Sequence, residues 1–241
     1  MFPFGIIPLM KNDIEFYLQN TGEVKISKLT KADLKILIST GESLFLEFKH
    51  KVASPEKIAR EMCAFANSKG GKILIGVSDN GEMLGIKSFL EEEFWLNKAA
   101  NEVCTPEIDF TMELLHLGPK DIMIVDVPEA ENKPVYVKTK NKRTVFVRHI
   151  DESVTASENK IEILKNESSD EEFTFEYGER EQLLFRFLNE YGEITVERFS
   201  ILINVTTYRA SKILVNLTSA GILNLFERDN VEYYTFTAKS A

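Results

Sequence analysis

The sequence contains few of the residues that build zinc sites or disulfide frameworks, with two cysteines and three histidines among its 241 residues. Cys63 and Cys104 do not form a close pair with metal-ligand spacing, and the histidines are too dispersed to complete a zinc motif. Both cysteines fall at apolar positions of predicted helices. We therefore expect them to be reduced core residues of a cytoplasmic protein.

Long hydrophobic runs are also missing. The opening residues 1–10 (MFPFGIIPLM) are apolar, but they contain two prolines, lack a basic start and are too short to cross a bilayer. We interpret residues 1–28 as an N-terminal arm that packs on its own domain or on a partner chain. No membrane association is expected.

No complete phosphate-binding loop is present. The sequence NSKGGK (residues 67–72) has the glycines and lysine of such a loop, but a true loop follows a strand and opens a helix. Here a predicted helix precedes the glycines and a predicted strand follows them, and Ile73 stands where the motif needs serine or threonine. ATP hydrolysis is therefore not expected.

Positive charge is scarce overall, since the formal net charge is −9. This charge argues against a protein that coats nucleic acid indiscriminately, because phosphate binding depends on local positive charge. The composition is otherwise that of a globular protein, and the length allows two domains. We expect a first domain over residues 29–165, an acidic linker over 166–178 and a small second domain over 179–241.

The strongest local signals begin at the segment SLFLEFK (residues 43–49). This segment predicts a strand, because its apolar residues alternate at period two and leave Glu47 on the opposite face. Ser54-Pro55 then opens a helix with a serine N-cap and proline at the first helical position. The helix is predicted to end at residues 67–71, where paired glycines supply the left-handed backbone that ends helices.

A second strand is predicted at KILIGV (residues 72–77), followed by a tight turn that begins at Asp79. The ends of the two strands then lie near each other, with Glu42 and Glu47 on one and Asp79 on the other. Three converging carboxylates repel one another unless a cation lies among them, and hard divalent cations take such oxygen ligands. The pattern indicates a Mg²⁺ or Mn²⁺ site. The alternative is three separate carboxylates, with Glu47 paired to a neighbouring lysine.

Four sequence blocks resemble, in the same order, the Schlafen AlbA-type domain of many bacterial regulators: GESLFLEFK, FANSKGGKILIGVSDNGEMLG, KPVYVK and VFVR. The resemblance runs from about residue 29 to about residue 164. It implies an α+β fold, with a mixed β-sheet and flanking helices. The sequence departs from the family after Arg148, where His149-Ile150-Asp151 stand in place of the family's Val-Gly-Ser.

The resemblance also implies roles for particular residues. In the Schlafen proteins that cleave RNA, the acidic triad corresponds to Glu42, Glu47 and Asp79 of this sequence. These residues would hold Mg²⁺ or Mn²⁺ in a metal-dependent endoribonuclease. In that hypothesis, Lys49 or the hairpin lysines position the nucleic-acid strand.

Residues 133–148 are strongly basic, with six basic and no acidic side chains. Two predicted strands flank a basic tip, and Tyr136 and Phe146 are interleaved with the charges. Such a hairpin can contact phosphates, and an exposed ring can stack on a base. The alternative is an edge hairpin whose lysines prevent pairing with other sheets. Its basic residues are Lys133, Lys138, Lys140, Lys142, Arg143 and Arg148.

The C-terminal segment predicts three amphipathic helices and a hairpin that turns at Asp229-Asn230, which is the pattern of a winged helix-turn-helix domain. The stretch SKILVNLTSAGIL resembles many bacterial winged-helix regulators. Arginine and lysine near the start of a recognition helix suit guanine edges and phosphates. The alternative is a winged helix used for protein contacts. The candidate groove contacts are Thr207, Tyr208, Arg209, Ser211 and Lys212.

These features favour a nucleic-acid-binding protein, expected to be a DNA-binding transcriptional regulator. The alternatives are the metal-dependent endoribonuclease of Schlafen type, acting on RNA, and a protein-interaction module. The chain has one AlbA-like unit, whereas the clamp of animal Schlafen domains needs two. A homodimer is therefore expected.

Overall fold

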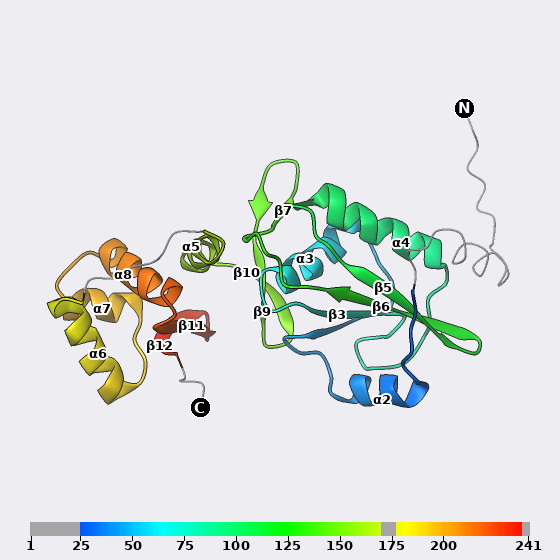
Figure 1. The fold of residues 1–241 in the computed structure, drawn as a ribbon, viewed down its shortest axis with the longest axis horizontal. Coiled ribbons are helices and arrows are strands. Elements are labelled where there is room, and N and C mark those ends of the chain that lie inside the picture. The colour runs from blue at the N-terminus through cyan, green and yellow to red at the C-terminus, as the bar shows by residue number, and fades with distance from the viewer. Residues whose placement is uncertain (1–24, 170–176, 238–241) are drawn as a thin grey trace. The chain divides into compact units, whose positions relative to one another are not determined.

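The structure is a computed structural model that describes residues 25–169 and 177–237 (Figure 1). The predicted arm up to residue 24 and most of the predicted acidic linker lie outside these ranges. Within them, no helix is both long and apolar enough to span a membrane. The chain divides into two compact units after Thr155.

The first unit is built on a five-stranded sheet with the strand order β1-β5-β6-β3-β2 (Figure 1). The pairs β2·β3 and β1·β5 are parallel, whereas β6 runs antiparallel to both β3 and β5. This mixed sheet with flanking helices confirms the predicted α+β fold. The strands are β1 (Lys25–Ile26), β2 (Leu46–Lys49), β3 (Gly71–Ile75), β5 (Thr111–Leu117) and β6 (Lys120–Val127).

Helices cover both faces of this sheet. Helices α3 (Pro55–Ala66) and α4 (Phe89–Lys98), continued by the π-helical turn η1 (Ala99–Val103), pack on one face, and α2 (Lys31–Ser39) packs on the other (Figure 1). Successive residues of a strand point to opposite faces. Ile73 therefore enters the core beneath α3 and α4, while Leu74 enters the core beneath α2.

Helix starts follow the predicted capping signals. The Ser54 side chain accepts a hydrogen bond from the Lys57 N–H, and Pro55 occupies the first helical position of α3. At the start of α2, Thr30 and Asp33 exchange the reciprocal hydrogen bonds of a capping box. Both N-termini are thus confirmed by the geometry.

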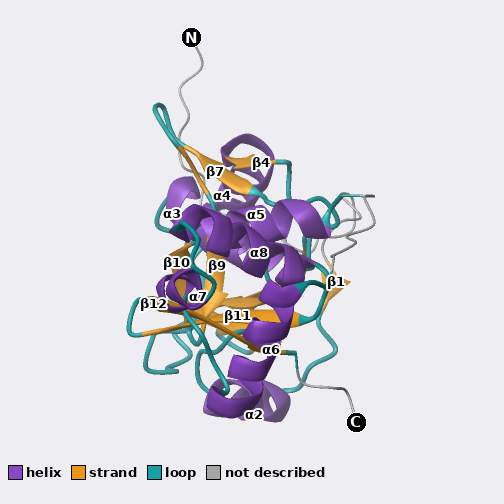
Figure 2. Ribbon diagram, turned by 90° about the vertical axis from the view of Figure 1, so that its left-hand side faces the viewer, coloured by secondary structure: helices purple, strands orange, loops and turns teal. Residues whose placement is uncertain are grey.

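Two smaller sheets lie beside α3. One contains β4 (Cys104–Thr105), β7 (Tyr136–Lys138) and β8 (Arg143–Thr144), and the other pairs β9 (Phe146–His149) with β10 (Glu152–Thr155) (Figure 2). Cys104 therefore starts a strand rather than lying in a helix as predicted. It is nevertheless buried, as is Cys63 on α3, and both are free thiols.

Asn67 joins the end of α3 to these strands. Its side chain is 1% exposed, accepts a hydrogen bond from the Val135 N–H at 2.7 Å and donates to the carbonyls of Val135 and Phe146 at 2.9 and 3.0 Å. One amide therefore satisfies three backbone groups and fixes β9 and the residue before β7 against the helix.

Among its described residues, the second unit contains four helices and a hairpin: α5 (Glu158–Glu167), α6 (Glu179–Tyr191), α7 (Val196–Leu202), α8 (Thr207–Ser219), β11 (Leu223–Arg228) and β12 (Val231–Phe236). The hairpin turns at Asp229 and Asn230, as predicted. Both residues have positive φ. The core beneath α6, α7 and α8 includes Leu184, Phe199, Leu214 and the fully buried Tyr234.

Helix α5 differs from the sequence-based expectation. The sequence predicts a first domain that ends at residue 165 and includes most of this helix, whereas the structure groups the helix with the second unit. Asn166 donates a hydrogen bond to the Ser219 hydroxyl on α8 at 2.9 Å, and Asn159 donates to Glu232 on β12 at 2.8 Å. Ile163 and Leu164 of α5 are buried. These contacts place α5 against α8 and the hairpin.

Candidate nucleic-acid interface and its charged surroundings

Glu47 lies where the period-two pattern of β2 predicts it. Leu46 and Phe48 enter the core beneath α2, so the Glu47 side chain points to the α3 face, where it is 8% exposed. Its Oε2 accepts a hydrogen bond from Arg148 Nη1 at 2.8 Å, and its Oε1 pairs with the Lys49 ammonium. Both carboxylate oxygens are therefore engaged by cations.

Arg148 on β9 is the centre of this arrangement. Its side chain is 0% exposed and also donates to the carbonyls of Ser43 and Asp151 and to the Ser153 hydroxyl, at 2.7, 2.9 and 3.0 Å. The guanidinium lies 4.7 Å from the centre of the Phe65 ring. The predicted phosphate contact by Arg148 is therefore wrong, because the side chain is enclosed and both Nη atoms donate internally, while the buried Nε has no partner.

Glu61 on α3 completes a neutral set of four charges. Its carboxylate lies 3.5 Å from Arg148 Nη1 and 3.8 Å from Lys49 Nζ, and it accepts a hydrogen bond from the Ser153 hydroxyl. Two carboxylates, Glu47 and Glu61, thus balance two cations, Arg148 and Lys49. Lys49 keeps 30% of its side chain exposed, but its charge is directed into this set.

Glu42 lies near the charges of both Glu47 and Asp79. Glu42 accepts a hydrogen bond from the Phe48 N–H at 2.9 Å. Its partial burial raises the pKa of its carboxyl group, and the negative charges of Glu47 and Asp79 raise that pKa further. Asp79 itself is exposed at the turn after β3.

This arrangement does not fit a divalent cation. Within residues 25–169 and 177–237, no group of three or more histidine, cysteine, aspartate or glutamate side chains is placed to hold a metal ion. Glu47 cannot bind a metal ion here, because Arg148 and Lys49 occupy the oxygens that it would offer to Mg²⁺ or Mn²⁺. The charge of Glu47 is neutralised by protein cations instead.

The basic hairpin forms as predicted. Strands β7 and β8 pair Lys138 with Arg143, and the Thr139 N–H donates to the Lys142 carbonyl at 2.8 Å across the tip. The four side chains at its end are exposed, namely Lys138, Lys140, Lys142 and Arg143.

The other residues of the basic stretch are not available to a ligand. The Lys133 side chain is 6% exposed and pairs with Glu129. Phe146 is buried, so it cannot stack on a base, and Tyr136 is half-buried. The accessible charge of the stretch is therefore confined to the hairpin tip.

In the second unit, the candidate contacts on α8 fall into two groups. Thr207, Tyr208 and Arg209 are exposed at the N-terminal end, which Thr206 caps by accepting a hydrogen bond from the Arg209 N–H. The predicted contacts further along are already engaged with α5. The Ser211 hydroxyl donates to Asn159 Oδ1 at 2.6 Å, and the Lys212 ammonium pairs with Glu162.

Sequence reasoning missed two features that bear on ligand binding. It assigned α5 to the wrong unit and so did not foresee that this helix covers part of α8. It also missed a set of cations at the end of β2 and the start of α3, where Lys49, Lys51, Lys57 and Arg60 line one pocket. The signal was present as four basic residues within twelve positions, but the intervening turn hid their proximity.

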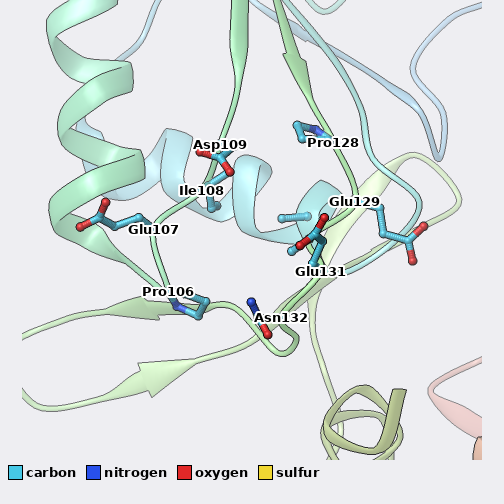
Figure 3. A pocket seen from close by; sticks show the side chains of 10 residues that line it. Pro106, Glu107, Ile108, Asp109, Pro128, Glu129, Glu131 and Asn132 are labelled. Carbon is cyan, nitrogen blue, oxygen red and sulfur yellow. The ribbon is translucent and has the colours of Figure 1, made fainter. Parts of the chain in front are cut away.

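An acidic pocket lies near the end of β6 (Figure 3). Its volume is about 280 Å³, and Glu107, Asp109, Glu129 and Glu131 are among the residues that line it. Glu129 is paired with Lys69 and Lys133, which hold the pKa of its carboxyl group below the usual value even though burial opposes this shift. The acidic lining excludes this pocket as a phosphate site.

Comparison with known proteins finds one family model that matches most of the first unit. Residues 42–157 match the family model described as Schlafen, AlbA_2. This match agrees with the resemblance drawn from the four sequence blocks.

Two solved structures are similar to parts of the chain. A protein from Corynebacterium diphtheriae is 15% identical over 76% of this chain, with a TM-score of 0.42. The N-terminal domain of a RecG-related protein from Nitrosomonas europaea is 20% identical over 60% of this chain and 94% of its own length, with a TM-score of 0.38. The chain spans 34% of the length of the corynebacterial protein.

Proposed function

We propose that this chain is a nucleic-acid-binding protein that contacts phosphates through the β7–β8 hairpin. The observation that carries the proposal is the exposure of four cations at one hairpin tip, with no acidic side chain between Lys138 and Arg143, in a chain whose net charge is −9. The hairpin lies inside the Schlafen AlbA_2 domain. Local positive charge of this kind is what phosphate binding requires.

We further propose that the second unit is a winged helix that contacts duplex DNA, as in a transcriptional regulator. Its three helices α6, α7 and α8 and its hairpin β11–β12 occur in the expected order. The accessible contacts are Thr207, Tyr208 and Arg209 at the start of α8, because α5 engages Ser211 and Lys212.

The test is fluorescence anisotropy of labelled duplex DNA and labelled RNA with the full chain at several salt concentrations. The Lys140→Gln/Lys142→Gln variant is expected to reduce the slope of log K against log salt by about 0.9 for each duplex phosphate that the protein no longer neutralises. Lys35→Gln is the matched control, since Lys35 is an exposed lysine on α2, at the other face of the sheet. Absence of binding to either nucleic acid at low salt would contradict the proposal and leave a protein-interaction module.

The same assay tests the role of α8. Arg209→Ala is expected to weaken duplex binding more than Lys212→Ala, because Lys212 is paired with Glu162. Equal affinity of both variants and the parent chain would contradict a DNA-reading role for this helix.

The structure offers no support for the ribonuclease alternative, since Glu47 is paired with cations. Incubation of transfer RNA with the protein and Mn²⁺ is expected to leave the RNA intact. Cleavage that disappears in the Asp79→Asn variant would reverse this conclusion, and the exposure of Asp79 makes that variant a mild one.

We also propose that the chain acts as a homodimer, because it contains one AlbA_2 domain and a two-fold assembly would provide a pair of basic hairpins. Sedimentation of the full chain is expected to give the mass of a dimer. A monomer at all concentrations would contradict this assignment.

A further inference from the structure

A pocket of about 260 Å³ lies between the loop after β2 and the first turns of α3. Four of the side chains that line it are cationic, Lys49, Lys51, Lys57 and Arg60, and one is acidic, Glu61. Lys57 and Arg60 stand three residues apart on α3, so both face the same side of the helix. The pocket is therefore rich in positive charge before any ligand is considered.

Glu61, the acidic residue of the pocket, does not neutralise Lys51, Lys57 or Arg60. Glu61 lies within 4 Å of Lys49 and Arg148, and these two cations together balance Glu61 and Glu47. No described carboxylate forms a salt bridge with Lys51, Lys57 or Arg60, and all three side chains are exposed. The nearby Glu56 does not line the pocket. No salt bridge among the described residues therefore neutralises these three charges, although the Glu92 carboxylate attracts Lys51 from a longer distance.

The neighbouring structure holds these cations in place without occupying their donors. The Arg60 guanidinium lies over the Phe146 ring at 4.9 Å, a contact that leaves its N–H groups free to bind an anion. The loop that carries Lys51 is fixed by Glu92 on α4, whose buried carboxylate accepts a hydrogen bond from the Val52 N–H at 2.7 Å. A site held in this way loses less conformational entropy when it binds a ligand.

We propose that Lys51, Lys57 and Arg60 form a second phosphate-binding subsite, separate from the hairpin, that takes a phosphate group of the nucleic-acid backbone. The inference rests on the proposed nucleic-acid function but assigns a contact that the hairpin does not make. A planar guanidinium and two ammonium groups supply the donors that phosphate oxygens accept. A nucleic acid that uses both subsites contacts α3 as well as the β7–β8 hairpin.

The test compares the triple variant Lys51→Gln/Lys57→Gln/Arg60→Gln with the hairpin variant Lys140→Gln/Lys142→Gln and the control Lys35→Gln. All are made in the full chain, and circular dichroism melting checks that each is folded. For duplex DNA, the triple variant is expected to reduce the salt slope by about 0.9 for each phosphate that it no longer neutralises. Arg60→Lys alone keeps the charge and is expected to keep the parent slope. A triple variant with the slope and affinity of the parent chain, beside a weakened hairpin variant, overturns the subsite but not the nucleic-acid function.

A second arm distinguishes a backbone phosphate from a free one. Inorganic phosphate is titrated into the ¹⁵N-labelled full chain, and the backbone amides of Lys51, Lys57 and Arg60 are followed by NMR. Shifts at these amides that disappear in the triple variant support a phosphate site, even if the parent chain binds no nucleic acid and the proposed function fails. No shift with phosphate and no change in nucleic-acid binding overturn the inference.

Discussion

Arg148 Nη1 donates a hydrogen bond to Glu47 Oε2 at 2.8 Å, although the two residues lie 101 positions apart in the chain. The contact joins β9 to β2 beneath α3, and neither side chain is more than 8% exposed. This pair determines how the acidic group of the domain is to be interpreted. A carboxylate that sequence reasoning assigned to a metal is the counter-ion of a buried guanidinium.

We predict that Arg148→Met destabilises the protein by about 3–5 kcal/mol, because removal of one partner of a buried ion pair leaves the other charge uncompensated. Urea unfolding followed by circular dichroism measures the change. In the double variant with Glu47→Leu, part of this loss is expected to return, since Glu61 and Lys49 then balance each other. A single variant within about 1 kcal/mol of the parent chain would show that the pair contributes little.

Asn67→Ala is expected to destabilise the first unit by about 3 kcal/mol, because it leaves the Val135 N–H and two carbonyls without their buried hydrogen-bond partner. Asn67→Asp is the informative comparison, since it keeps the acceptor for Val135 but loses both donors. We expect Asp to restore little stability in an equilibrium unfolding experiment. Full recovery with Asp would mean that the two donated hydrogen bonds are unimportant.

Gly70 and Gly118 provide a matched pair for the cost of a side chain. Their φ values are +71° and +72°, so alanine suffers the same left-handed backbone strain of about 1–2 kcal/mol at each. A Cβ at Gly70 would meet the Val127 carbonyl oxygen at 2.8 Å, whereas nothing lies within 4 Å at Gly118. Gly70→Ala should therefore lower the free energy of unfolding by at least about 1 kcal/mol more than Gly118→Ala. Equal losses would refute the steric argument.

Glu92 should make the stability depend on pH. Burial raises the pKa of its carboxyl group above the unfolded value, and the Val52 hydrogen bond opposes this only in part. The folded protein then binds a proton more tightly than the unfolded chain, so its stability falls as pH rises from the unfolded pKa of about 4.3 through the raised folded pKa. Glu92→Gln keeps an oxygen for Val52 and removes this dependence.

The measurement is thermal melting of both proteins between pH 4 and pH 7. Relative to the parent chain, Glu92→Gln is expected to become steadily more stable as the pH rises. Glu91→Gln is the control, because that neighbouring side chain is exposed. A stability difference that stays constant with pH would mean that Glu92 is ionised to the same extent in the folded and unfolded states.

Much of the fold could be predicted from short-range signals. The Thr30 and Ser54 caps, the alternation around Glu47 and the turn at Asp229 depend on a few neighbouring residues, and all are present. Gly71 is required at its position, but not for the left-handed backbone that the sequence argument assigned to the paired glycines. Its backbone is not left-handed, but a Cβ there would lie 2.3 Å from the Phe65 ring.

The candidate site was less predictable, because its character depends on which charges meet across the fold. Sequence reasoning placed Glu42 near Glu47 and Asp79, and the charges of both act on Glu42 in the structure. It could not identify Arg148 as the cation among them. That residue belonged to a basic stretch that was interpreted as surface.

The sequence by itself determined the class of fold, the starts of α2 and α3, and the hairpins β7–β8 and β11–β12, because each depends on local periodicity or on turn and capping residues. The tertiary structure alone decided the partners of the charges. Arg148 pairs with Glu47, α5 engages Ser211 and Lys212, and Lys51, Lys57 and Arg60 share a pocket. Ion pairing depends on distance and burial, and the packing of remote elements sets both.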